Sequence, residues 1–381
     1  MRAEFLNAFF LILIMVFNLQ KEKLGTLIEN NIWYSFTEKQ LISISNYYNV
    51  LFLLDQGFSN KEIHKKYNIS LDCITNWKNN HRIPPAVKIL EEFEVKYFGK
   101  YFDEDLLLLA YLVGYNLGDG NISKNFCNTW FYGVFQDLNK MKEIFSFFDV
   151  KPIVYNYKID NGKMAVHDRL FSRLLFCFGA VSGDKTLSSF EVPEWILDSK
   201  NKLIKVRFLQ GLFDSELCCL SQIRENSYSH LSFVNSKRID LIDSGIKYLQ
   251  QIKYLLSELE ITSSTIKIDR TYFRSRDSAV MQEVYFYLHS NSINLDRFVS
   301  SVGHLYNSKR HFLVKIHSEN LKKNSLNEKR ALELYPKVLE LRKIGYSAYK
   351  IAKLTNLSIS KIKYWIYKKG KPRAFYFASN S

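Results

Sequence analysis

The 381-residue sequence contains few cysteines, and none has the spacing of a known structural site. The five cysteines are an odd number, include no C-x-x-C pair and show no zinc-ligand spacing with the eight histidines. This argues against a fold stabilised by disulfides or by zinc and fits reduced thiols. We therefore expect an intracellular protein, located in the cytoplasm, a nucleoid or an organelle matrix.

The sequence also lacks an apolar run long enough to cross a bilayer. Residues 6–17, LNAFFLILIMVF, are apolar except for Asn7, but these twelve residues fall short of the roughly 20 that a spanning helix needs. The continuation VFNLQKEKL offers no small-residue cleavage site for a secretory signal. We expect a buried segment or a true start at Met15, and a membrane anchor is the alternative.

Acidic residues are fewer than basic residues. Asp and Glu number 38 against 53 Lys and Arg, which gives a net charge of +15. Such a surplus favours a polyanionic partner such as nucleic acid over an anionic membrane surface. The alternative is a basic surface that only confers solubility. With 47% hydrophobic and 15% aromatic residues, the chain can bury the cores of two or three domains.

A repeat links the two ends of the chain. Nine residues between Gly57 and Pro84 recur between Gly345 and Pro372 at a constant offset of 288. The first copy is a glycine turn, a short helix capped by Ser59, a break at residues 68–70 and a second helix. This layout predicts a helix-turn-helix unit at each end, and a plain helical hairpin with a solvated basic face is the alternative.

Positive charge is densest in the C-terminal copy. Residues 335–377 contain eleven Lys and Arg residues against one acid, Glu340. We expect this surface to bind phosphates in a salt-dependent way. The residues singled out for DNA contact are Lys361, Lys363, Lys368 and Lys369.

The middle of the chain twice contains an apolar stretch with small residues four positions apart, YLVGYNLGDG at residues 111–120 and FLQGLFDSEL at residues 208–217. Small residues at this spacing share one face of a helix and let two helix backbones approach closely. The residues expected at this helix interface are Gly114, Gly118, Gly211 and Ser215.

Each stretch closes with an acid, Asp119 in the first and Glu216 in the second. If the two helices pack in parallel, both carboxylates emerge together at helix C-termini, where the helix dipole and a second negative charge disfavour them. A divalent cation would resolve that conflict. Oxygen ligands from carboxylates, carbonyls and water suit Mg²⁺.

The segments that follow each stretch have the same predicted order. Strand-like and helix-like patterns give α-β-β-α-β-β-α twice, so the expected fold class is α+β with two related halves. The expected boundaries are an apolar N-terminal segment, a helix-turn-helix module, the first half, the second half and a basic helix-turn-helix module, at residues 1–36, 37–98, 99–198, 199–318 and 328–381.

With these residues in view, LVGYNLGDG and LQGLFDSEL resemble the two motif copies of a single-chain LAGLIDADG homing endonuclease. The resemblance covers about 210 residues and includes KVRFLQGLFDSE and FGAVSGDKTLSSFEVPEWI. It implies two halves about a pseudo-twofold axis, with antiparallel sheets that form a saddle over double-stranded DNA. It also implies Mg²⁺-dependent phosphodiester hydrolysis at Asp119 and Glu216, with Gly118 and Ser215 in the metal site. The sequence departs from the motif at Leu217, where glycine is usual.

The resemblance also suggests basic residues near the acids. Lys185 and Lys309 stand late in each half, like the lysines of the family, and are candidates for stabilising charge in the transition state. Further candidates for DNA contact on the expected strands are Lys124, Gln136, Gln222, Arg224, Arg270 and Arg274.

Two functions remain in competition. The first is a site-specific endonuclease of a mobile element such as an intron, which acts as a monomeric pseudo-dimer on DNA with no small-molecule substrate. The second is a non-catalytic DNA- or RNA-binding regulator, or an intron-splicing maturase, on the same fold. Self-splicing would need Cys or Ser first and His-Asn last, whereas the chain runs from Met1 to Ser381, so we expect a free-standing protein.

Overall fold

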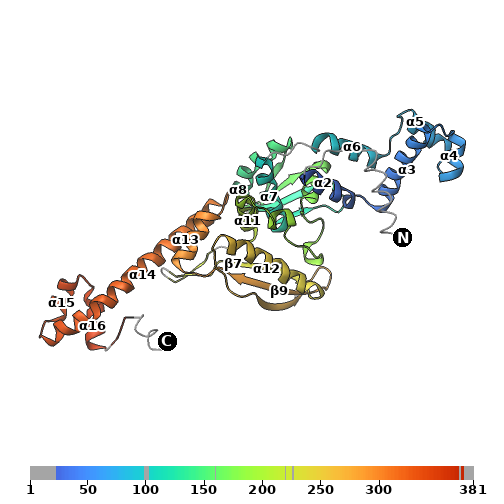
Figure 1. Cartoon of the computed structure of the whole chain (residues 1–381). Helices are drawn as coiled ribbons and strands as arrows, with labels where there is room; N and C mark the ends of the chain where they lie inside the picture. The colour runs from blue at the N-terminus through green and yellow to red at the C-terminus, as the bar shows by residue number, and fades with distance from the viewer. Residues whose placement is uncertain are drawn as a thin grey trace.

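The computed structural model describes residues 23–97, 103–158, 160–218, 220–224, 227–368 and 370–372. Figure 1 shows a central body of helices and sheets with a helical extension at each end of the chain. Within the described residues, no helix combines the length and apolar character needed to cross a bilayer. The apolar segment 6–17, for which a membrane anchor is the alternative interpretation, lies outside the described residues.

The first half contains one four-stranded antiparallel sheet in the order β1-β2-β4-β3. Phe131 pairs with Met164 in its centre, and both side chains are buried against the helices. Asp168 caps the last helix by accepting hydrogen bonds from two backbone N–H groups. The elements are α7 (Asp103–Leu117), β1 (Gly120–Ile122), β2 (Thr129–Val134), α8 (Phe135–Met141), η2 (Lys142–Phe148), β3 (Ile153–Lys158), β4 (Asn161–Val166) and α9 (Arg169–Cys177).

The second half follows the same order with a different first hairpin. Its elements are α11 (Lys202–Glu216), β5 (Gln222–Arg224), β6 (Ser227–Tyr228), β7 (Ser232–Arg238), η4 (Ile239–Leu241), α12 (Ile242–Glu258), β8 (Lys267–Phe273), β9 (Val280–Tyr287) and α13 (Ser292–Ser301). Strands β7, β9 and β8 form one antiparallel sheet, whereas β5 pairs with β6 in the part of the chain that is described. The expected α+β class with two antiparallel sheets is confirmed, although the sheets differ in composition.

The connection between the halves carries two short helices, η3 (Lys185–Leu187) and α10 (Glu194–Leu197). It leads directly into α11, whose first turn is capped by the side chain of Asn201. Because η3 lies at the ends of the motif helices, this connection contributes to the site described below.

The two motif helices α7 and α11 pack side by side. A Cβ atom on Gly114 would lie 2.1 Å from the carbonyl oxygen of Phe208, and one on Gly118 would lie 1.9 Å from Ser215 Oγ. Gly211 meets the backbone of α7 just as closely. A side chain has no room at these positions, so glycine permits the backbone contact. The contacts advance in the same direction along both helices, so α7 and α11 run parallel, which is the condition under which the two acids were expected to meet.

The two end modules share their local geometry at the offset of 288. In each, a serine caps the first helix, an asparagine in the left-handed conformation ends it, and another serine caps the second helix. The capping residues are Ser59, Asn68 and Ser70 in one copy and Ser347, Asn356 and Ser358 in the other. The helices are α4 (Asn60–Tyr67) and α5 (Leu71–Lys78), and α15 (Ala348–Thr355) and α16 (Ile359–Tyr367).

The repeat extends into the helix that precedes each pair, α3 (Glu38–Asp55) or α14 (Ser308–Lys343). Tyr47 packs edge-on against Trp77 with ring centroids 5.6 Å apart, and Tyr335 packs against Trp365 at 5.3 Å. Both residues of the second pair follow those of the first by 288 positions. Each module is therefore a three-helix unit with its own small core. The remaining N-terminal elements are α2 (Lys23–Ile32), η1 (Trp33–Ser35) and α6 (Pro85–Tyr97).

Candidate active site at the ends of the motif helices

The two motif acids lie next to each other. Asp119 follows the end of α7, and Glu216 is the last residue of α11. A Cβ atom on Gly118 would lie only 2.7 Å from Glu216 Cγ, so the ends of the two helices touch at the acids. Burial and the charge of Asp119 raise the pKa of Glu216 to about 7. Partial burial also raises the pKa of Asp119, and Lys185 and Arg310 oppose that rise.

Lys185 closes the C-terminus of α7. Its Nζ donates hydrogen bonds to the carbonyl oxygens of Asn116 at 2.8 Å and Leu117 at 3.3 Å. The loop that carries it is fixed because Asn116 Oδ1 accepts a hydrogen bond from the Val181 backbone N–H at 3.0 Å. Burial lowers the pKa of Lys185 to about 8, and the negative charge of Glu216 opposes this shift. The structure thus brings Lys185 to the acid pair, as the sequence predicted.

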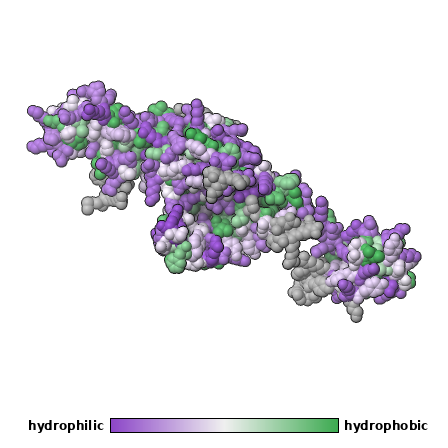
Figure 2. All heavy atoms as spheres, turned by 180° about the vertical axis from the view of Figure 1, so that it is seen from behind, coloured by the Kyte–Doolittle hydropathy of each residue, from purple (hydrophilic) through white to green (hydrophobic). Residues whose placement is uncertain are grey.

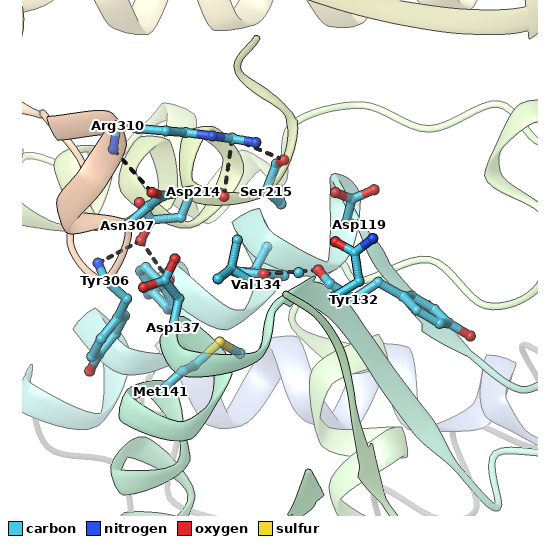
Figure 3. A pocket seen from close by; sticks show the side chains of 14 residues that line it. Asp119, Tyr132, Val134, Asp137, Met141, Asp214, Ser215, Tyr306, Asn307 and Arg310 are labelled. Atoms are coloured by element: carbon cyan, nitrogen blue, oxygen red, sulfur yellow. Dashed lines mark hydrogen bonds between the residues drawn. The ribbon is translucent and has the colours of Figure 1, made fainter. Parts of the chain in front are cut away.

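Arg310 closes the C-terminus of α11 in the same manner. Its guanidinium donates to the carbonyl oxygen of Leu217 at 2.9 Å. It also donates more weakly to the carbonyl oxygens of Asp214 and Ser215, each at 3.4 Å (Figure 3). The preceding loop is fixed because Asp214 Oδ2 accepts a hydrogen bond from the Tyr306 backbone N–H at 2.9 Å. Cations of this kind suit a helix C-terminus, where carbonyl groups and the helix dipole are negative.

The two loops have the same register. In the first half, the anchored Val181 precedes Lys185 by four residues; in the second, the anchored Tyr306 precedes Arg310 by four. The structural counterpart of Lys185 is therefore Arg310. Lys309, the residue proposed from the sequence, lies one position earlier with an exposed side chain. Sequence reasoning favoured it because lysine was expected, whereas backbone anchoring sets the register.

Leu217 does not disturb the end of α11. Its backbone is extended, with φ −65° and ψ 125°, so the freedom of glycine is not required here. Its side chain is fully buried in the core, and its carbonyl oxygen accepts a hydrogen bond from Arg310. In contrast, Gly120 is confined, because a Cβ atom there would lie 2.4 Å from Asn116 Cα. The departure from the motif is thus accommodated by a different helix end.

Asp214 is a buried acid that links both halves, and sequence reasoning did not single it out. Its Oδ2 accepts a hydrogen bond from the Tyr111 hydroxyl of α7 at 2.9 Å in addition to that from Tyr306. Its Oδ1 lies 3.3 Å from His304 Nδ1, and both side chains are almost fully buried. Asp214 therefore ties the loop of Arg310 to both motif helices.

Lys237 is a second residue that the sequence did not reveal. This buried lysine of β7 donates to the carbonyl oxygens of Lys185 and Ser188, each at 2.8 Å, and lies 3.6 Å from the centre of the Phe190 ring. Burial and the charge of Lys185 lower its pKa to about 7. The second half thus holds the loop that carries the cation of the first half.

Arg274 belongs to the same set of contacts. It donates to Asp184 Oδ2 at 2.9 Å and also pairs with Asp277, and its side chain is largely buried. Arg276 pairs with Asp184 as well. Asp184 in turn caps η3 at Thr186. Arg274, predicted to contact DNA, is therefore engaged in holding the connection between the halves.

A cavity of about 300 Å³ opens beside Asp119 (Figure 3). It lies between the ends of α7 and α11, the end of β2, α8 and the start of α14. Its polar lining includes Asp119, Asp137, Asn307 and Arg310. Burial raises the pKa of Asp137, and Lys140 and Arg310 oppose that rise. The cavity thus joins one motif acid to the cation of the second half.

The other residues predicted to contact DNA are dispersed. Gln136 lies in α8, which begins at Phe135, so its placement on a strand was wrong. Arg270 on β8 is exposed and pairs with Glu283 at 3.0 Å. Lys124 is exposed in the β1–β2 turn. Gln222 and Arg224 lie in β5, Lys361 and Lys363 in α16 and Lys368 at its C-cap, while Lys369 is outside the described residues.

No protein-family model matches the chain. Among curated proteins, the DNA-directed RNA polymerase subunit Rpo1N of Methanocaldococcus jannaschii is 28% identical over 247 residues, which cover 58% of this chain and 17% of the relative. The tRNA-splicing ligase RtcB of Pyrococcus furiosus is 24% identical over 291 residues, which cover 71% and 29%. This chain therefore spans less than a third of the length of these relatives.

Solved structures similar to this chain include variants of the homing endonuclease I-DmoI, with 13% identity, a TM-score of 0.36 and coverage of 55% of this chain and 98% of the other. Full-length DUF199/WhiA from Thermatoga maritima has 13% identity, a TM-score of 0.33 and coverage of 71% and 93%. Other structures of I-DmoI are complexes with DNA and Mn or Ca. The structural neighbours are thus LAGLIDADG proteins, the family that the two motifs resemble.

Proposed function

We propose that this protein is a site-specific endonuclease that hydrolyses phosphodiester bonds in double-stranded DNA with a divalent metal, Mg²⁺. The supporting observation is the pair of carboxylates at the ends of two parallel helices, with one cation from each half above a helix end. The pKa values of both carboxylates are raised even though Lys185 and Arg310 lie nearby. A bound metal ion would stabilise the ionised forms of the two carboxylates.

The donor set fits a hard cation. The proposed ligands are the carboxylates of Asp119 and Glu216, with the backbone oxygens of Gly118 and Ser215 beside them. Within the described residues, no cluster of three or more His, Cys, Asp or Glu side chains could hold a metal, so the remaining ligands would be water and phosphate oxygen. Mg²⁺ commonly binds through one or two carboxylates plus water and phosphate. When bound, it would activate water and stabilise charge on the phosphate.

The residues of the chain supply the rest of the mechanism. Lys185 and Arg310 are held by backbone carbonyl oxygens, so each cation is already oriented before DNA arrives. Fixed positive charge beside a reacting phosphate stabilises the negative charge that builds up on its oxygens, without a reorganisation cost. Because burial lowers the pKa of Lys185 to about 8, the positive charge of this lysine is lost progressively as the pH rises through 8.

We further propose that both end modules are helix-turn-helix units that bind DNA. The serine caps, the left-handed asparagine and the two short helices match that motif in both copies. Additional contacts outside the central body would lengthen the recognised sequence and raise specificity.

A randomised double-stranded DNA library tests the main proposal. The library is incubated with wild-type protein in Mg²⁺ and in EDTA, and in parallel with Asp119→Asn. We expect metal-dependent cuts at one sequence that disappear in the variant. Selective binding without cutting would instead support the non-catalytic regulator or maturase, and equal cutting by Asp119→Asn would refute the proposed site.

A further inference from the structure

Helix α14 joins the candidate active site to the C-terminal module. Arg310 lies in its first turn, and Val314 and Ser318 are buried against the second half. At its other end, Ala331 and Val338 belong to the core of the C-terminal module. The same helix therefore positions a cation at the acids and carries the module; Figure 1 shows α14 running from the central body to α15 and α16.

The middle of α14 is exposed to solvent, and contacts to other helices occur at its two ends, between Lys322 and Asp296 and between Arg330 and the carbonyl oxygen of Thr355. Residues 322–330 are all exposed, and the sequence KKNSLNEKR contains neither glycine nor proline. Pro336, the one proline inside α14, lies within the C-terminal module. Since bends in helices arise mainly at proline, glycine pairs or bulges, the exposed stretch has none of the sequence features of a hinge. From Arg310 to Val338 the helix rises about 42 Å, at about 1.5 Å per residue.

The exposed face of the C-terminal module suits a polyanion. The core residues Ile362 and Trp365 repeat Ile74 and Trp77 of the N-terminal copy, whereas positions outside the core differ. In α5 those positions hold Asp72, Cys73 and Thr75, and in α16 they hold Ser360, Lys361 and Lys363. Figure 2 shows a mainly hydrophilic surface on this module. The two copies thus share a scaffold, while the C-terminal copy carries two lysines at positions of its second helix where the N-terminal copy has Cys73 and Thr75.

We propose that α14 is a rigid spacer that places the C-terminal module on duplex DNA at a fixed distance from the scissile phosphates. This inference rests on the proposed DNA-binding function. With about 3.4 Å per base pair, a 42 Å spacer that runs along the duplex corresponds to about 12 base pairs. The module binds DNA on the side of the second half, and the length and helical phase of α14 set where it binds.

Insertions into the exposed stretch test this spacer. Two alanines after Asn327 rotate the module by about 200° and turn α16 away from DNA, whereas seven alanines restore the phase to within about 20° and lengthen the spacer by about 10.5 Å. The readout is hydroxyl-radical footprinting in Ca²⁺, on duplexes recovered by binding selection in Ca²⁺. A variant with Lys361→Gln and Lys363→Gln leaves α14 unchanged and removes two charges.

We expect outer protection about 12 base pairs from the centre for the wild type. It should vanish with two inserted residues and with the charge variant, and move outward by about 3 base pairs with seven. Central protection that stays constant shows that the body remains folded. Outer protection that is missing in the wild type, or unmoved by the insertions, would overturn the inference. Loss of cleavage with both protected regions intact would instead contradict only the proposed nuclease activity.

Discussion

The two halves hold a cation at the end of a motif helix with different residues. Both place a cation over the carbonyl groups that end a motif helix, and both fix the cation-bearing loop through a polar side chain on that helix. The first half uses Asn116 and Lys185, and the second uses Asp214 and Arg310. The comparison shows that backbone anchoring is the shared feature, while the identity of the acid, the cation and the anchor varies.

The halves also differ in what supports these loops. The Lys185 loop is held from the opposite half by Lys237 and by Arg274 through Asp184. The loop that precedes Arg310 is held by Asp214, which accepts a hydrogen bond from the Tyr306 backbone N–H. Asp214 also accepts a hydrogen bond from the Tyr111 hydroxyl of the opposite half. Each cation therefore depends on contacts across the interface between the two halves, so the two halves should not function independently.

The largest expected effect concerns the feature that both halves share. Asp119→Asn and Glu216→Gln should each reduce cleavage by about 10³-fold or more, because each removes a metal ligand worth several kcal/mol without removing volume. DNA affinity in Ca²⁺ should change by less than about threefold, since the electrostatic contacts remain. Single-turnover cleavage and gel-shift titrations measure the two quantities. Wild-type cleavage by either variant would contradict the site.

A smaller loss is expected from the cation of the first half alone. Lys185→Met should slow cleavage by about 10²-fold, the usual cost of one fixed donor at a developing charge. The matched control is Lys142→Met, which changes an exposed lysine of the same half. Equal rates for both variants would mean that Lys185 only stabilises the end of α7.

How far the sequence anticipates this comparison can be judged from particular residues. The small-residue spacing correctly predicted close contact between α7 and α11, and the two closing acids were expected to meet if the helices ran parallel. The cation of the second half was not, because a hydrogen bond between Tyr306 and Asp214 sets the loop register, and no spacing rule contains it. The pairing of β5 with β6 and the early start of α8 at Gln136 likewise depend on tertiary packing.

Support across the interface predicts an intermediate effect. Lys237→Met should slow cleavage by about tenfold, a typical cost for a residue that orients a ligand or catalytic group, with unchanged DNA affinity. Because Lys237 acts through the Lys185 loop, the double variant with Lys185→Met should be no slower than Lys185→Met alone. Lys253→Met is the control, since it removes another lysine-to-carbonyl bond of the second half. Additive losses would exclude a positioning role.

The smallest effect concerns stability without metal. The raised pKa of Glu216, about 7, means that the folded state binds a proton more tightly than the unfolded state. Stability in EDTA should therefore be highest near pH 4.5 and fall as the pH rises through 7. Glu216→Gln should remove this decline and stabilise the protein at pH 8 by about 3 kcal/mol. Urea unfolding between pH 4.5 and 8 measures it, with Glu328→Gln as an exposed control; parallel curves for all three proteins would contradict the raised pKa.

The most direct test of the central claim, that each half supplies one anchored cation to a shared acid pair, is strand-resolved cleavage by Arg310→Met and Lys309→Met. Both variants remove one positive charge from adjacent positions in the first turn of α14, so charge and location are matched. The account predicts that Arg310→Met slows cleavage by about 10²-fold, with the larger loss on one strand, and that Lys309→Met stays within about twofold of wild type. A large loss in Lys309→Met with normal cleavage by Arg310→Met would contradict it.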